Sequence, residues 1–211
     1  MNSSDSIDLR RTGSWLGVYF AVLLWSAIQP KDNFTWWLEV LPALLGLVVL
    51  ALTYRRFRLT PLAYWLILGH CIILMVGGHY TYAEVPLFDW LRQVFVLERN
   101  NFDKLGHFAQ GFVPAIVARE ILLRKAIVHG RGWLFYIVVS ICLAISAFYE
   151  LIEWWVAVFS GTSAEAFLGT QGDIWDTQSD MAFALVGAIL ALVLLGKVHD
   201  RQLAGLASRT G

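Results

Sequence analysis

The chain has 211 residues, of which 58% are hydrophobic, 14% aromatic and only 15% charged. Soluble domains carry about 25% charged residues, so this composition, with a mean hydropathy of +0.61, excludes an ordinary soluble protein and indicates an integral membrane protein. The 16 basic and 16 acidic side chains balance, so no overall positive field favours nucleic acid as a partner. Cys71 and Cys142 lie in apolar runs, which is typical of packed small hydrophobes rather than of a disulfide framework.

Six apolar segments each have about the 20 residues that a helix needs to cross the hydrocarbon of a bilayer. In chain order they cover residues 14–29, 36–53, 61–79, 105–123, 132–154 and 179–197. The residues after the first segment, SAIQPKDNF, lack a small-x-small cleavage site, so we interpret this segment as an uncleaved anchor. No repeat or low-complexity tract divides the sequence. We therefore expect a single integral membrane domain over residues 1–211.

A further helix is predicted between the third and fourth apolar segments. The stretch PLFDWLRQVFVL places apolar side chains at helical spacing, at Leu87, Phe88, Leu91, Val94 and Phe95. This pattern predicts a short amphipathic helix that lies on the outer leaflet. The expected fold class is an all-α membrane protein, a bundle of six transmembrane helices with a short amphipathic helix at its outer face.

Lysine and arginine in the connections predict the orientation of the bundle, because these residues are enriched in cytoplasmic loops. They are concentrated in alternate connections, at Arg10, Arg11, Arg55, Arg56, Arg58, Arg124, Lys125, Arg131, Lys197, Arg201 and Arg209. The opposite connections carry fewer basic residues, at Lys31, Arg92, Arg99 and Lys104. This asymmetry predicts cytoplasmic N- and C-termini and outward-facing connections at about 30–35, 80–104 and 155–178.

Polar residues are clustered at the predicted outward ends of the last three apolar segments. Residues three or four apart share a helix face, which aligns Asp103, His107 and Gln110, and likewise Glu150 and Glu153. We expect these clusters to meet in one acidic pocket with a histidine. The candidate ligand-pocket residues are Asp103, Lys104, His107, Gln110, Tyr149, Glu150, Glu153, Asp173, Asp176 and Asp180.

Some of these polar residues also have a purely structural explanation. Asn101 or Asp103 stands where it can cap the start of the fourth transmembrane helix. Asp176 or Asp180 stands at the start of the sixth, where a carboxylate favours the positive end of the helix dipole. For these four residues we expect capping to be the main role.

Two glutamates do not fit that explanation. Glu150 and Glu153 lie at the C-terminal end of the fifth helix, where the dipole disfavours a carboxylate. They therefore need a cation. In a structural interpretation this cation is Lys104 or Arg99, whereas in a functional one it is a protonated His107 or a bound metal ion.

A metal ion is the cofactor that such a set of residues would hold. Several carboxylates with one imidazole suit Mg²⁺, Mn²⁺ or Zn²⁺. In this alternative the ligands of a divalent cation are His107, Glu150, Glu153, Asp176 and Asp180.

The same motifs carry a family resemblance. RNNFDKLGHFAQGFVPAIVARE at 99–120, YELIEWW at 149–155 and GTQGDIWDTQSDM at 169–181 resemble the YjdF family of bacterial inner-membrane proteins, in an order that covers nearly the whole chain. The resemblance implies a multi-pass protein of the inner membrane with six helices, and it assigns no catalytic residue.

A fainter similarity extends to VanZ-like proteins, which share an Asp-Lys-x-x-His element with Asp103, Lys104 and His107. Their later Asp-x-x-x-Asn element is matched only at Asp180, because Ala184 occupies the place of the asparagine. Glycopeptide resistance, to which some VanZ-like proteins are linked, therefore does not follow from this similarity.

Two functions of different classes follow. The first is the binding or handling of an envelope component, a lipid or lipid-linked ligand, by a protein embedded in the lipid bilayer. The second is a metal-dependent hydrolase or transferase acting on a lipid-linked phosphate, in which the cation would activate water. The sequence has no S-G-H element with R-x-x-x-x-x-H-x-x-x-D, and no Walker A or G-x-S-x-G motif, so we favour the first and leave open whether the protein is an enzyme.

Overall fold

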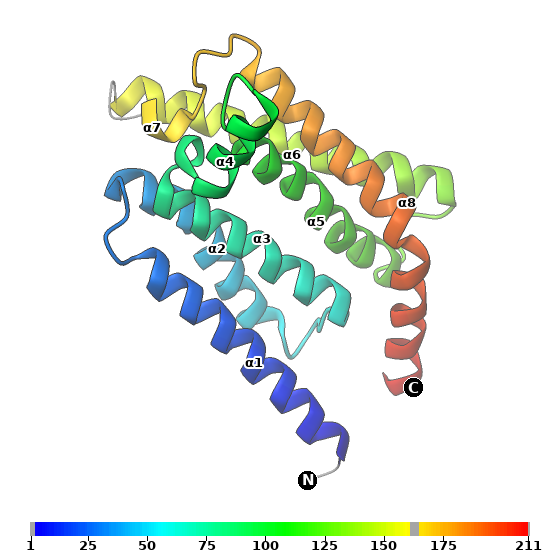
Figure 1. Cartoon of the computed structure of the whole chain (residues 1–211). Coiled ribbons are helices and arrows are strands. Elements are labelled where there is room, and N and C mark those ends of the chain that lie inside the picture. The colour runs from blue at the N-terminus through cyan, green and yellow to red at the C-terminus, as the bar shows by residue number, and fades with distance from the viewer. Residues whose placement is uncertain (1–2, 161–164, 211) are drawn as a thin grey trace.

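The computed structural model describes residues 3–160 and 165–210, and within these ranges all regular structure is helical (Figure 1). The elements in chain order are α1 Ser3–Ser26, α2 Asn33–Thr53, α3 Pro61–Tyr80, the 3-10 turn η1 Tyr82–Glu84, α4 Pro86–Phe95, α5 Phe102–Arg124, α6 Arg131–Ser160, α7 Glu165–Leu168 and α8 Asp176–Thr210. The all-α class is confirmed, and each predicted apolar segment coincides with most of one long helix. Residues 161–164, in the predicted outward connection 155–178, lie outside the described residues.

Four of the helices are long and apolar enough to cross a membrane, namely α2, α3, α6 and α8 as far as Leu206. Among the described residues, α1 and α5 do not meet this condition. In α5 the reason is visible in the sequence, because charged residues stand at both ends of the helix, with Asp103 and Lys104 at one and Arg119, Glu120 and Arg124 at the other. A helical membrane protein is therefore supported, whereas six spans stay a prediction.

Two of the membrane helices are longer than their apolar segments predict. Helix α6 has 30 residues and α8 has 35, which correspond to about 45 and 52 Å against a hydrocarbon core of about 30 Å. Hydropathy marks only the part of a helix that lies in lipid, so it does not locate the ends of these two. In Figure 1 the C-terminal part of α8 turns away from the rest of that helix.

Polar caps explain where α2 and α3 begin. The carboxylate of Asp32 accepts a hydrogen bond from the backbone N–H of Thr35, at 2.6 Å, and the hydroxyl of Thr60 accepts one from Ala63, at 3.3 Å. Each bond satisfies a backbone donor in the first helical turn. Pro61 at the start of α3 lacks the amide that would otherwise be unpaired there.

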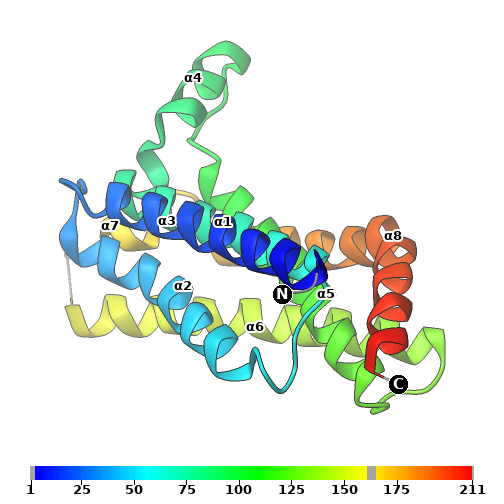
Figure 2. The same ribbon diagram turned by 90° about the horizontal axis from the view of Figure 1, so that it is seen from below.

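Helix α5 lies at the centre of the bundle, with α8, α6 and α3 packed around it (Figures 1 and 2). Helices α1 and α2 pack on α3 and complete the bundle on the other side. The core is correspondingly divided in two. One part joins α5, α6 and α8 to the start of α3 around Ile116 and Val138, and the other joins α1, α2 and α3 around Tyr19 and Met75.

Small residues bring the backbones of α5 and α8 into contact. A Cβ atom added at Gly111 would lie 1.8 Å from the carbonyl oxygen of Ala184, and one added at Gly187 would lie 2.2 Å from that of Phe108. Close approach of this kind through small residues is the usual way in which membrane helices associate. It fixes the position of α5 relative to α8, and with it the polar side chains that both helices carry.

The predicted amphipathic helix is present as α4, and it projects sideways from the bundle (Figure 2). No residue of α4 is fully buried. Leu87 is 61% exposed, Trp90 57% and Phe95 65%, so a row of large apolar side chains faces outward. That this surface rests on the outer leaflet stays a prediction.

Candidate functional site

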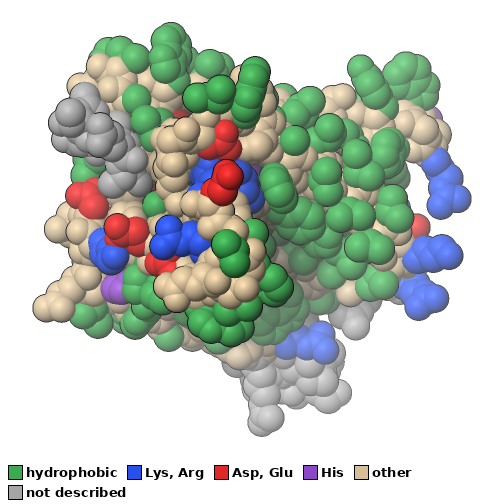
Figure 3. Space-filling model, turned by 45° about the horizontal axis from the view of Figure 1, so that its top comes forward, with side chains coloured by type: hydrophobic (Ala, Val, Ile, Leu, Met, Phe, Trp, Pro, Cys, Tyr) green, Lys and Arg blue, Asp and Glu red, His purple; other side chains and the backbone are tan. Residues whose placement is uncertain are grey.

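The polar residues predicted from three separate segments meet at one end of the bundle, where α5 and α8 begin and the C-terminal half of α6 passes. Figure 3 shows acidic and basic side chains side by side at this end, bordered by hydrophobic ones. We refer to this set as the polar cluster, defined as Arg99, Asp103, Lys104, His107, Glu150, Asp173, Asp176 and Asp180. The side chains expected to converge lie close together, and most of these charged groups are buried. That they form a ligand pocket stays a prediction.

Lys104 joins α5 to α8. Its ammonium donates hydrogen bonds to Asp176 Oδ1 at 2.8 Å and to Asp180 Oδ1 at 2.7 Å, and it lies 3.8 Å from Asp103. The side chains of Lys104 and Asp180 are 8% and 2% exposed, so these charges are compensated by one another rather than by water.

Arg99, in the connection before α5, closes the cluster from outside the helices. Its guanidinium contacts Asp176 at 2.5 Å, Asp173 at 3.3 Å and Asp103 at 3.4 Å, and it donates to the carbonyl of Gly169 at 3.1 Å. Burial acts to lower the pKa of Arg99, but the hydrogen bond and charge of Asp176 outweigh it and raise the pKa above its ordinary value. Arg99 therefore ties the connection before α8 to the first turn of α5.

His107 lies between α6 and α8 and faces oxygen atoms on both sides of its ring. Nε2 is 3.4 Å from Asp103 Oδ1 and 3.9 Å from Asp180 Oδ2. Nδ1 is 3.2 Å from Gln110 Oε1 and 3.7 Å from Glu150 Oε1. Only the imidazolium form can donate from both nitrogens, so this arrangement matches a positively charged ring.

These contacts bear on which cation accompanies Glu150. Of the interpretations that the sequence left open, they favour His107, because Lys104 and Arg99 pair with aspartates and His107 is the basic group nearest to Glu150 among the described residues. The reason is the register of α5. Lys104 and His107 are three positions apart, which places them about 60° apart around the helix. The Lys104 ammonium reaches Asp176 and Asp180 of α8, whereas His107 also reaches Glu150 of α6. The capping role expected of Asn101 is wrong, because Asn101 precedes α5 without a side-chain capping bond. Asp103, Asp176 and Asp180 form ion pairs instead.

Tyr149 and Glu39 extend the polar cluster toward α2. The hydroxyl of Tyr149 donates to Glu39 Oε2 at 3.4 Å, and its ring lies 6.2 Å from that of His107, edge to face. Glu39 is 3% exposed and also bonds Tyr82, whose pKa is raised well above its ordinary value by burial and by the charge of Glu39. Sequence reasoning missed Glu39, although a lone carboxylate within the apolar segment 36–53 was a usable signal.

Acidic groups outnumber basic ones in this region. Its carboxyl groups are Glu39, Asp103, Glu150, Glu153, Asp173, Asp176 and Asp180. Its cations are Arg99, Lys104 and, when protonated, His107. Buried carboxylates without a counter-ion are costly, so some of these groups must bind protons or an additional cation.

Two buried polar atoms near His107 have unused hydrogen-bonding capacity. Within the described part of the chain, no hydrogen-bond partner is present for Glu150 Oε1 or for the hydroxyl of Ser146 one turn before it. The Nε donor of Arg99 likewise has no hydrogen-bond partner among the described residues. Buried polar atoms are nearly always paired, so these three atoms mark where a ligand or water would be accommodated.

Two sets of side chains have the geometry to hold a metal ion. The potential ligand atoms of Asp103, His107 and Asp180 lie within 4.8 Å of one another, and so do those of His107, Glu150 and Glu153. One imidazole with carboxylates fits a hard or borderline divalent cation. Asp176, a predicted ligand, belongs to neither set, and its Oδ1 accepts hydrogen bonds from Arg99 and Lys104. Metal binding stays a prediction.

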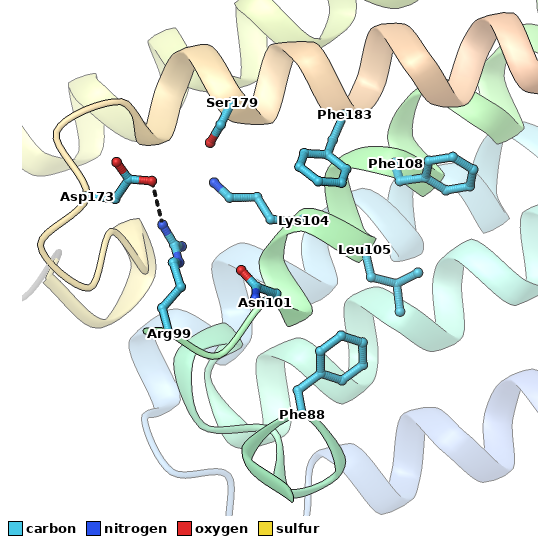
Figure 4. A pocket seen from close by; sticks show the side chains of 9 residues that line it. All are labelled: Phe88, Arg99, Asn101, Lys104, Leu105, Phe108, Asp173, Ser179 and Phe183. Carbon is cyan, nitrogen blue, oxygen red and sulfur yellow. Dashed lines mark hydrogen bonds and ion pairs between the residues drawn. The ribbon is translucent and has the colours of Figure 1, made fainter. Parts of the chain in front are cut away.

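A cavity of about 530 Å³ opens beside the polar cluster, and Figure 4 shows its lining. One side is polar, with Arg99, Lys104, Asn101, Asp173 and Ser179. The other side is apolar, with Phe88 of α4, Leu105 and Phe108 of α5, and Phe183 of α8. The cavity therefore combines charged groups with a hydrophobic wall, and His107 and Glu150 are not among its lining residues.

A second buried polar network lies at the opposite end of α5, and sequence reasoning missed it. Glu120 is fully buried and accepts hydrogen bonds from the backbone and hydroxyl of Thr60, from Arg124 at 2.8 Å and from His199 at 3.1 Å. Arg119 contacts His199 at 3.0 Å. The pairing of ARE at 118–120 with VHD at 198–200 was the available signal. This network fastens α5 to α8 and to the start of α3.

Comparison with known proteins places the chain in a family. A family described as a predicted membrane protein (DUF2238) matches residues 12–201. The chain is 52% identical over 190 residues, 90% of its length and 91% of the relative's, to the inner membrane protein YjdF of Escherichia coli (strain K12). No solved structure matches it. The resemblance seen in the motifs is thus confirmed, and the chain belongs to the DUF2238 family of predicted membrane proteins.

Proposed function

We propose that this membrane protein crosses the bacterial inner membrane six times, with both termini in the cytoplasm, and binds an amphiphilic envelope component at the outward-facing polar cluster. The envelope component would be a lipid or a lipid-linked molecule. The observation that carries the proposal is the cavity in which Arg99 and Lys104 stand opposite the side chains of Phe108 and Phe183.

The charges of α5 are compatible with a membrane span despite their number. Lys104 is paired with Asp176 and Asp180, and Glu120 with Arg124 and His199. Ionisable groups in membrane segments normally face the bundle interior and pair there. Mean hydropathy underestimates the tendency of such a helix to span a membrane, because it includes charged side chains that face the bundle interior rather than lipid.

The shape of the cavity suggests how the ligand would lie. A hydrocarbon chain would pack against Phe88, Phe108 and Phe183, and a polar headgroup would lie at Arg99, whose Nε donor has no hydrogen-bond partner among the described residues. Asp173, whose side chain is 32% exposed, stands beside that guanidinium. A headgroup with a phosphate and an ammonium, as in zwitterionic phospholipids, would complement both charges.

The excess of carboxyl groups would also allow the polar cluster to bind protons, which a protein that takes up and releases a ligand could use. Protons bound among Glu39, Glu150 and Glu153 would change the charge of the polar cluster without changing the helices. Binding of the envelope component can in this way be linked to proton uptake.

A metal-dependent hydrolase or transferase acting on a lipid-linked phosphate is the second candidate. The convergence of His107, Glu150 and Glu153 favours it. We rank it second because these residues do not line the cavity, so a phosphate held there would be separated from the cation by Lys104 and Asp103.

Ser179→Phe is the sharpest test, because it fills the cavity and leaves every charge in place. Ser179 lines the cavity, and its hydroxyl donates to the carbonyl of Asp176 in its own helix. Gln178→Phe is the matched control, since Gln178 is the adjacent residue of α8, is exposed and does not line the cavity.

The measurement is native mass spectrometry of the protein released from inner-membrane vesicles in mild detergent, with identification of the retained lipids. The unaltered protein and Gln178→Phe should retain a specific amphiphile, and Ser179→Phe should lose it. Equal retention by all three proteins, or no retention beyond bulk lipid, would contradict the proposal.

A further inference from the structure

A second and larger cavity, of about 990 Å³, lies at the end of the bundle away from the polar cluster. It is enclosed by the first turns of α1 after residue 10, the connection from α2 to α3, and the C-terminal part of α8. Figure 1 shows these three segments near one another below α5. Its volume is at the upper end of the range of about 300–1,000 Å³ that is usual for small-molecule sites.

The rim of this cavity is strongly basic. Five arginines line it, namely Arg11, Arg55, Arg56, Arg58 and Arg124. No aspartate or glutamate of the described residues is among its lining. Positive charges gathered in a concave surface repel one another unless an anion lies between them.

Three of these arginines have no counter-ion among the side chains that the structure describes. The guanidinium groups of Arg11, Arg55 and Arg56 are exposed, and none forms an ion pair or hydrogen bond with a described side chain. Arg124, by contrast, is held by Glu120 at 2.8 Å and by the carbonyl of Arg58 at 2.6 Å. Arg124 is therefore a fixed part of the wall, whereas the other three are available to a ligand.

Below the arginines the cavity is apolar. Its wall is formed by Trp15 and Leu16 of α1, Leu47 and Leu50 of α2, and Leu203 of α8. The indole N–H of Trp15 donates to the carbonyl of Tyr64 at 2.8 Å, which fixes the ring in this wall. An inorganic anion at the rim would leave this apolar surface uncovered.

We propose that this cavity binds an anionic phospholipid of the adjacent leaflet, with the phosphate at Arg11, Arg55 and Arg56 and the acyl chains along Leu47, Leu50 and Trp15. Basic pockets between membrane helices at the positive end of a bundle are typical sites for such headgroups, and arginine matches phosphate through paired N–H donors. The site is separate from the polar cluster and depends neither on its ligand nor on the direction in which the chain crosses the membrane.

The test compares three additives on the delipidated protein in neutral detergent. Phosphatidylglycerol at a hundredfold excess over its Kd should raise the melting midpoint by roughly 5–10 °C. Phosphatidylcholine with the same acyl chains and inorganic phosphate should each raise it by far less. An equal shift with phosphatidylcholine, or the full shift with inorganic phosphate, would overturn the proposal.

Substitutions test whether the rise in melting midpoint arises from binding at this cavity. Arg55→Gln combined with Arg56→Gln should abolish most of the shift, and should lose phosphatidylglycerol adducts in native mass spectrometry. Arg131→Gln is the matched control, because Arg131 is an exposed arginine at the same end of the bundle that does not line the cavity. Ser179→Phe should also keep the full shift, which separates this site from the one at the polar cluster. Retention of the shift and of the adducts in the double variant would overturn the proposal.

Discussion

The contact between α5 and α8 determines the geometry of the polar cluster, and Gly111→Ala tests it most severely. A Cβ at this position would lie 1.8 Å from the carbonyl oxygen of Ala184. The obstructing atom belongs to a helix backbone, so no side chain can rotate away. Relieving the contact to 3.0 Å requires the helices to separate by about 1.2 Å.

The loss in the free energy of unfolding follows from the contacts between α5 and α8 that the separation disrupts. Overpacking of a tight core costs about 1–3 kcal/mol, and we expect a value near 3 kcal/mol because backbone must move. The separation also lengthens the ion pairs of Lys104 with Asp176 and Asp180, now 2.8 and 2.7 Å. For a protein of this size the melting midpoint should fall by roughly 6–12 °C.

The assay is thermal unfolding in detergent, followed by the fluorescence of the ten tryptophans. Gly196→Ala is the matched control, because a Cβ at Gly196 of α8 has nothing within 4 Å. Its midpoint should stay the same or rise slightly, since alanine favours helix over glycine by up to about 1 kcal/mol. If Gly111→Ala melts within a degree of the unaltered protein, the close approach of α5 and α8 is refuted.

Three further predictions concern the charges and the topology. Lys104→Met should cost about 3–5 kcal/mol, because it leaves Asp176 and Asp180 buried without their ammonium partner, and an unchanged melting midpoint would contradict that role. Addition of Mg²⁺, Mn²⁺ or Zn²⁺, or of a chelator, should leave the melting midpoint unchanged, whereas a divalent cation held by His107 and Glu150 would add about 2.7 kcal/mol at a hundredfold excess over Kd. A reporter fused after the last residue should be active in the cytoplasm, and activity in the periplasm would overturn the proposed orientation.

The sequence predicted which residues gather at the polar cluster, because that prediction needed only helical periodicity and the alternation of the spans. Asp103 and His107 are one turn apart, and the outward ends of successive helices follow from loop charge. Both inferences use distances within one helix or the order of helices along the chain. Neither depends on how a helix is rotated against its neighbours.

The pairings inside the cluster could not be predicted in this way. Whether Lys104 or His107 faces Glu150 depends on the rotation of α5 relative to α6 and α8. The close contacts of Gly111 and Gly187 join α5 to α8, and periodicity along one helix does not predict them. The contribution of Glu39 depends in the same way on where α2 lies. The network around Glu120 was not predicted, because charged side chains near a predicted helix end are usually solvated. In the structure α8 extends beyond its apolar segment, and His199 of α8 covers Glu120.

The most direct measurement is a high-resolution density map of the protein in nanodiscs prepared from native inner membrane. The proposal predicts elongated density in the cavity between α4, α5 and α8, with its polar end at Arg99 and Lys104 and its chain against Phe108 and Phe183. A cavity without density, or compact density between His107 and Glu150 at metal-ligand distances, would contradict it.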